Sequence, residues 1–136
     1  MSGRLLIAGT HSGCGKTTVT LALLSALKAR GIPLAAFKCG PDYVDPMFHR
    51  EVLGLPSRNL DPFFGTGDAL CAAIADQNGR LSVIEGVMGY YDGVGARGAY
   101  STYDVARATQ TPVVLVVDAR GMYTSAGAIL SGFRSF

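Results

Sequence analysis

The chain has 136 residues, of which 49% are hydrophobic and 16% charged, a composition typical of one globular domain with a substantial buried core. Its net charge of +2 is too small to indicate a nucleic-acid-binding or membrane-binding surface, and we expect neither partner. The apolar stretches 5–8 and 111–117 are too short for a signal sequence or a membrane span. Three scattered cysteines, Cys14, Cys39 and Cys71, indicate reduced thiols in a cytoplasmic protein.

Strand and helix patterns alternate along the chain. Uniformly apolar runs predict buried strands at 4–9, 33–39, 81–86 and 112–119. Helices are predicted at 15–31, 67–76 and 101–109, from 125 onward, and as a short helix at 46–53 inside the polar segment 40–64. Ser101 and Asp104 have the spacing of a capping box. This alternation predicts an α/β fold, a parallel sheet covered by helices on both faces. Because no strand follows the last helix, we expect a truncated domain.

Residues 9–18, GTHSGCGKTT, join the first strand to the first helix and resemble a phosphate-binding loop. The common pattern needs glycine where Thr10 stands, and Gly9 lies one place earlier. A strand, a glycine-rich turn and a helix N-terminus are nevertheless present in the order that phosphate binding requires. We therefore expect a P-loop NTPase-like fold that binds a nucleoside triphosphate. The expected nucleotide contacts are Thr10, His11, Ser12, Gly13, Cys14, Gly15, Lys16, Thr17 and Thr18.

The metal that accompanies such a nucleotide needs oxygen ligands. Lys16 is expected to pair with the β- and γ-phosphates, and Thr17 to place its hydroxyl on Mg²⁺. Glu85 and Asp118 both end predicted strands, at the sheet edge where ligands bind in α/β folds. We favour Glu85, because the segment GVMGYYDG after it looks like a loop that closes over a substrate. The alternative for Asp118 is a cap of the following turn, and His11 either contacts phosphate or is an exposed loop residue.

A second polar group follows the second strand in FKCGPDYVDP. Lys38 ends the strand, and Asp42 and Asp45 follow in a loop that Pro41 and Pro46 stiffen. A lysine and two carboxylates beside a phosphate-binding loop suit metal binding and control of a reacting group. The alternative is a solvated acidic loop.

Several motifs together carry a specific resemblance: GTHSGCGKTT, FKCGPDYVDPMFH, NLDPFF, IEGVMGYYDG and STYDVARATQTPVVLVVDARGM. They closely resemble the cobyrinic acid a,c-diamide synthase family over essentially the whole chain. Dethiobiotin synthetase is similar only in the loop, the lysine after the second strand and the acid of the Glu-Gly pair. The resemblance implies that ATP and Mg²⁺ drive conversion of two corrinoid carboxylates into amides, with glutamine supplying the nitrogen.

The resemblance also implies roles for residues outside the loop. It implies that Asp42 and Asp92 orient the reacting carboxylate and its ammonia, and that Tyr43 lines the substrate site. The full expected catalytic set is Lys38, Asp42, Asp45 and Asp92, and the expected metal ligands are Thr17, Asp45 and Glu85. Three arginines either hold substrate carboxylates that do not react or are ordinary surface residues: Arg50, Arg58 and Arg97.

The family implies a further glutaminase half with a cysteine nucleophile. We expect that half to be absent, with residues 1–136 forming the N-terminal part of the ATP-binding synthetase domain. None of the cysteines has the turn and partner histidine of such a nucleophile, so the chain alone would at most use free ammonia.

Other functions stay open at this point. One is a related tetrapyrrole a,c-diamide synthase acting on hydrogenobyrinate or nickel-sirohydrochlorin. Another is a Min/Par-type nucleotide-switch ATPase, which is disfavoured because His11 stands where that class carries its signature lysine. A homodimer is a further option.

Overall fold

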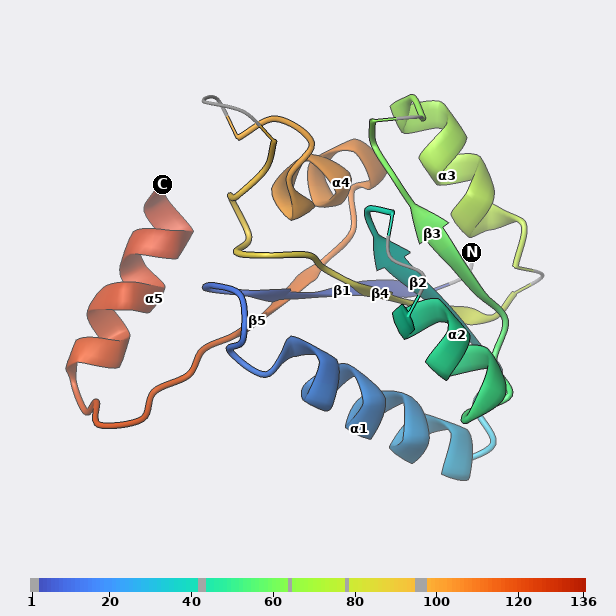
Figure 1. Cartoon of the computed structure of the whole chain (residues 1–136), viewed down its shortest axis with the longest axis horizontal. Coiled ribbons are helices and arrows are strands. Elements are labelled where there is room, and N and C mark those ends of the chain that lie inside the picture. The colour runs from blue at the N-terminus through green and yellow to red at the C-terminus, as the bar shows by residue number, and fades with distance from the viewer. Residues whose placement is uncertain (1–2, 42–43, 64, 78, 95–97) are drawn as a thin grey trace.

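The computed structural model describes residues 3–41, 44–63, 65–77, 79–94 and 98–136 (Figure 1). The predicted positions Asp42, Tyr43 and Arg97 lie outside these ranges. Within them the elements are, in chain order, β1 (Arg4–Gly9), α1 (Lys16–Ala29), β2 (Leu34–Cys39), α2 (Val44–Glu51), β3 (Ser57–Leu60), α3 (Gly67–Ala75), β4 (Leu81–Glu85), α4 (Thr102–Thr109), β5 (Val113–Val116) and α5 (Ser125–Ser135).

The strands of the described part of the chain form one parallel sheet in the order β3-β2-β4-β1-β5 (Figure 1). β4 lies between β1 and β2, so that Glu85 pairs with Ile7 on one side and with Lys38 on the other. The carboxyl ends of these three strands therefore meet at one edge of the sheet, and the predicted α/β parallel fold is confirmed.

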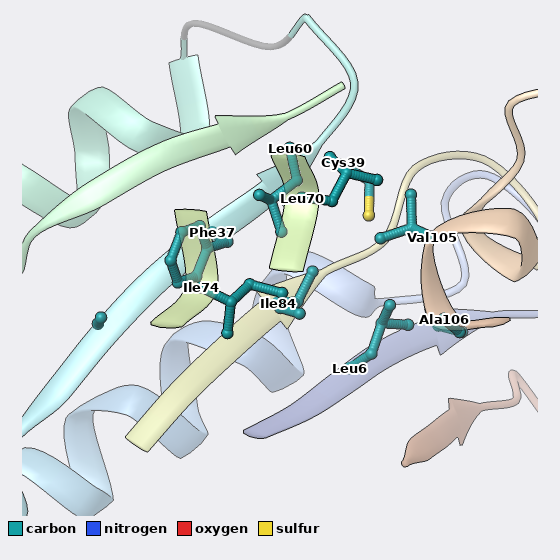
Figure 2. Packing of buried hydrophobic residues seen from close by; sticks show 11 residues of the cluster. Leu6, Phe37, Cys39, Leu60, Leu70, Ile74, Ile84, Val105 and Ala106 are labelled. Carbon is teal, nitrogen blue, oxygen red and sulfur yellow. The ribbon is translucent and has the colours of Figure 1, made fainter. Parts of the chain in front are cut away.

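Successive strand residues point to opposite sides of the sheet, so the mostly apolar strands place apolar side chains on both faces. Helices cover both of these faces. Figure 1 shows α1 and α2 on one side and α3 and α4 on the other. The α3–α4 face holds a buried apolar cluster (Figure 2) that includes Leu6, Phe37, Cys39, Leu60, Leu70, Ile74, Ile84, Val105 and Ala106. The opposite face packs on α1 through Ile7, Leu24, Leu34, Ala36, Leu55 and Val83. Lys38 lies two residues after Ala36 on β2, and Glu85 two residues after Val83 on β4. Because alternate residues of a strand point to the same side, Lys38 and Glu85 lie on the α1 side of the sheet.

Some boundaries differ from those that the sequence predicts. No strand is expected within 40–64, but β3 lies there, short and at the sheet edge, with the polar residues Arg58 and Asn59 at its centre. α2 starts at Val44, because Pro46 falls in its first turn, where a backbone N–H has no helical acceptor. β5 ends at Val116, before the predicted end of the strand.

The predicted capping box at the start of α4 is confirmed. The Asp104 N–H donates to Ser101 Oγ at 3.2 Å, and the Ser101 N–H donates to Asp104 Oδ2 at 2.9 Å. The next residue, Thr102, binds Val87 through both its hydroxyl oxygen and its hydroxyl proton, at 2.9 and 3.0 Å. The capped helix thus anchors the chain as it leaves β4.

Among the described residues, no helix has the length and apolarity needed to span a membrane.

Candidate functional site

The turn between β1 and α1 exposes backbone N–H groups. Gly13 and Gly15 have φ of 79° and 103°, in the left-handed region that glycine adopts at least cost. The first turn of α1 has no acidic residue, and no described side chain caps its N-terminus. A hollow of about 280 Å³ lies over this turn, lined by Gly13, Gly15, Lys16, Thr17 and Thr18. An open helix N-terminus facing a hollow is the arrangement that binds phosphate.

Gly9 explains why the loop departs from the common spacing. A Cβ at this position would collide with Cys14 Sγ and lie 2.8 Å from Lys16 Cγ. The loop folds both side chains back against the end of β1, and Lys16 Nζ donates to the His11 carbonyl at 3.1 Å. The Thr10 N–H donates to the Val116 carbonyl at 3.2 Å, which continues the pairing of β1 with β5. Glycine is therefore needed one place earlier than usual.

We expect Gly9→Ala to lower the free energy of unfolding by about 1–3 kcal/mol, because the added methyl overpacks the loop. Gly127→Ala is the matched control, since a Cβ there meets nothing within 4 Å and α5 favours alanine over glycine. Urea unfolding of both variants measures the difference. An equal stability for the two variants would contradict the steric role of Gly9.

The remaining loop side chains are mostly exposed. Ser12, Thr17 and Thr18 are exposed, whereas Cys14 is buried. His11 is exposed, with Nδ1 2.7 Å from the Ser12 carbonyl oxygen, so its ring contacts the loop itself.

Asp118 behaves as a cap of the turn after β5. Its carboxylate accepts the Arg120 N–H at 3.1 Å and the Arg120 guanidinium at 2.6–3.0 Å. These hydrogen bonds lower the pKa of Asp118. The structure supports the turn-cap alternative rather than a metal ligand.

Glu85 is the centre of a polar cluster at the carboxyl edge of the sheet. Its side chain is fully buried, and Oε1 accepts hydrogen bonds from the Thr17 hydroxyl at 2.6 Å and from Lys38 Nζ at 2.9 Å. Lys38 Nζ also pairs with Asp45 Oδ2 at 2.8 Å and donates to the Gly86 carbonyl at 3.2 Å. The phosphate-binding loop, β2, β4 and α2 thereby meet at one carboxylate.

Lys38 is charged in this cluster. Burial alone would lower the pKa of its ammonium, but the hydrogen bond that Lys38 donates to Asp45 and the charge of Glu85 outweigh burial, and the pKa is raised. Lys38 therefore neutralises part of the negative charge of Asp45 and Glu85 and holds them at one place.

His49 is a member of the cluster that the sequence analysis did not single out. It lies four residues after Asp45 on α2, a spacing that places both on one helix face. The ring is fully buried, with Nδ1 3.0 Å from Ser57 Oγ and Nε2 4.0 Å from Glu85 Oε2. Burial lowers its pKa, although the charges of Glu85 and Asp45 act in the opposite direction. The four-residue spacing of Asp45 and His49 could have indicated that His49 lies near the site, but only once these residues were known to be helical.

The donor set fits Mg²⁺. Thr17 offers a hydroxyl, and Asp45 and Glu85 offer carboxylate oxygens, the hard ligands that Mg²⁺ prefers. Glu85 Oε2 is buried without a hydrogen-bond partner in the described part of the chain, which leaves an acceptor that needs one. Across the described ranges, no group of three or more His, Cys, Asp or Glu side chains is placed to hold a metal ion, so the set that would hold Mg²⁺ includes the Thr17 hydroxyl.

The segment after β4 is tied to the phosphate-binding loop, whereas the sequence suggests a free closing loop. The Tyr90 N–H donates to the Gly9 carbonyl at 2.8 Å, and the Tyr91 hydroxyl donates to the Phe133 carbonyl at 2.6 Å. Asp92 lines a cavity of about 430 Å³ that also contacts Thr10. Asp92 is therefore already beside the loop, and residues 86–92 need no large movement to reach it.

The other candidate residues have structural contacts. Burial raises the pKa of the Cys39 thiol to about 12, so this cysteine is unreactive at neutral pH. Arg50 donates to the Ser57 carbonyl at 3.0 Å, and Arg58 pairs with Asp76 at 3.2 Å on the surface.

Known proteins are similar to this chain in sequence. The chain is similar to the cobyrinate a,c-diamide synthases of Listeria monocytogenes serovar 1/2a, with 49% identity over 98% of the chain, and of Thermoplasma volcanium, with 48% identity over 98%. The enzyme of the same name from Synechocystis sp. is 45% identical over 96%. The chain spans 30%, 30% and 28% of these relatives, respectively. The expected resemblance is confirmed. A family model described as the CobQ/CobB/MinD/ParA nucleotide binding domain matches residues 5–135, and the chain belongs to this family.

Proposed function

We propose that the chain is the nucleotide-binding part of a cobyrinate a,c-diamide synthase that uses ATP and Mg²⁺. The enzyme amidates the a- and c-carboxylates of cobyrinic acid in cobalamin biosynthesis, in the cytoplasm, with ammonia derived from glutamine. Because the chain spans about 30% of its relatives, we infer that a glutaminase domain lies outside residues 1–136 of this sequence. The observation that carries the proposal is Glu85, which joins Thr17 of the phosphate-binding loop to Lys38 and Asp45.

The chemistry follows from the poor reactivity of a carboxylate. A carboxylate oxygen of the corrinoid attacks the γ-phosphorus of ATP, the bond to the β-phosphate oxygen breaks, and ADP leaves. Ammonia then attacks the carbonyl carbon of the acyl phosphate, loses a proton, and phosphate departs with the original carboxylate oxygen. Positioning and charge neutralisation are the main tasks of the protein in such a phosphoryl transfer.

Each side chain has a defined part in this scheme. Lys16 and the loop N–H groups hold the phosphates. Thr17, Asp45 and Glu85 hold Mg²⁺, which when bound neutralises charge on the phosphate oxygens. Lys38 keeps the two carboxylates together. The remaining roles follow the family resemblance: Asp42 and Asp92 orient the reacting carboxylate and ammonia, and Tyr43 lines the corrinoid site.

The test is ATP turnover driven by free ammonia in the full-length synthase, with cobyrinate, hydrogenobyrinate and nickel-sirohydrochlorin compared. Turnover with cobyrinate, and formation of its diamide, supports the proposal. Preference for either other macrocycle assigns the related diamide synthase instead. ATP turnover that is the same with and without each macrocycle, together with nucleotide-dependent dimerisation on a sizing column, would favour a nucleotide switch.

A further inference from the structure

Two buried polar atoms face each other without hydrogen-bond partners in the described part of the chain. They are Glu85 Oε2 and His49 Nε2, and they lie 4.0 Å apart. The other carboxylate oxygen, Oε1, already accepts two hydrogen bonds, from Thr17 and Lys38. An N–H···O hydrogen bond spans 2.7–3.2 Å, so a movement of about 1 Å would satisfy both atoms. Buried polar atoms left unpaired are costly, which favours that movement.

The His49 ring contacts Ser57 through the nitrogen that does not face Glu85. Its Nδ1 lies 3.0 Å from Ser57 Oγ, and Ser57 is itself buried at the start of β3. On the same residue, the Ser57 carbonyl accepts a hydrogen bond from Arg50. Two side chains of α2, His49 and Arg50, thus contact Ser57 of β3. A serine hydroxyl that donates to Nδ1 fixes the neutral tautomer whose proton is on Nε2, aimed at Glu85.

We propose that His49 is a positioning residue for Glu85, and that Ser57 sets the tautomer that lets it act. When Mg²⁺ and ATP bind, the Nε2–H of His49 donates to Oε2 of Glu85. This contact fixes the carboxylate so that Oε1 faces Thr17 and the phosphate-binding loop. Partners of this kind orient metal-binding carboxylates, and their loss typically costs about 10- to 100-fold in metal affinity. The inference rests on the Mg²⁺–ATP site of the proposed function.

The experiment measures binding rather than turnover. Calorimetry of the full-length synthase gives the affinity for a non-hydrolysable ATP analogue with and without Mg²⁺, and the ratio of the two affinities reports the metal site alone. We expect His49→Ala to reduce this ratio about tenfold or more and to leave the metal-free affinity unchanged. His49→Gln keeps an N–H donor and should recover part of the ratio.

Ser57→Ala is the second variant, because it removes one oxygen atom and leaves the ring in place. It should reduce the ratio about two- to tenfold, the range of one neutral hydrogen bond. Ser82→Ala is its matched control: Ser82 is fully buried on β4 and its hydroxyl has no partner in the described part of the chain. This control should leave the ratio unchanged.

¹⁵N NMR of the imidazole provides an independent signature. The His49 signal, identified by its loss in His49→Gln, should show the proton on Nε2 in the parent and a mixture of tautomers in Ser57→Ala. A proton on Nδ1 in the parent, or an unchanged Mg²⁺ ratio in Ser57→Ala and His49→Ala, overturns the inference. If the ratio shifts as expected but no macrocycle is amidated, the inference stands and the proposed reaction falls.

Discussion

Lys16→Ala is expected to weaken MgATP binding by about 30- to 5,000-fold, the equivalent of about 2–5 kcal/mol. Lys16 is only 7% exposed, and its ammonium is held over the loop by the His11 carbonyl, where the phosphates would lie. A charge that meets phosphate in such a sheltered place is weakly screened by water. The fold should survive, because Lys16 belongs to neither apolar cluster and its ammonium bonds to a carbonyl of the same loop.

Lys28→Ala is the matched control for this effect. It removes the same charge from the last turn of the same helix, where Lys28 Nζ donates to the Leu53 carbonyl at 2.6 Å. Calorimetry with MgATP on the full-length synthase compares the two variants, with thermal unfolding as the test of the fold. If Lys16→Ala binds MgATP as tightly as Lys28→Ala, the loop does not hold the phosphates.

Asp92→Asn should reduce amidation by about 10²- to 10³-fold while MgATP affinity stays near normal. Asp92 lines the cavity beside Thr10, and its predicted role is to orient the reacting groups. Loss of one oriented, charged hydrogen bond at a reacting centre costs about 3–4 kcal/mol. Glu85→Gln should instead raise the Mg²⁺ concentration needed for half-maximal turnover, because Glu85 contacts Thr17 directly.

Mg²⁺ titrations of ATP turnover in both variants separate the two roles. The isosteric amides keep the shape of each side chain and remove its charge, so packing damage is small in both. A shift of the Mg²⁺ dependence in Asp92→Asn, with none in Glu85→Gln, would show that the roles are exchanged.

The elements that the sequence predicted are those whose signal is local. The runs that became β1, β2 and β4 are mostly apolar, without regular alternation with polar residues, because both faces of the sheet are covered. The glycine-rich turn of the loop follows directly after β1. Lys38 and Glu85 could be placed at the same edge of the sheet from sequence alone, because both lie at the ends of parallel strands; the structure adds that the two residues are direct neighbours. The spacing of Ser101 and Asp104 was sufficient for the helix cap.

The features that were missed depend on contacts between distant segments. β3 has an edge position and a polar centre, so no apolar run marks it, and it exists because β2 offers an open edge. His49 gains its position only when α2 packs on β3 and brings Ser57 to the ring. The closing loop expected after Glu85 is tied down by a hydrogen bond from Tyr90 to Gly9, which no pattern within GVMGYYDG could indicate.

The central place of β4 in the sheet has a consequence for how the protein is made. β1 and β2 leave the ribosome early, but each pairs with β4 and not with the other. At about 5–20 residues per second, the stretch between Cys39 and Glu85 takes roughly 2–9 s to synthesise. During that interval the apolar strands β1 and β2 have open edges, and chain-entropy costs delay pairing over such sequence distances. The nascent chain therefore exposes unpaired apolar strands in those seconds, and Thr17, Lys38 and Glu85 can come together only after β4 has been synthesised.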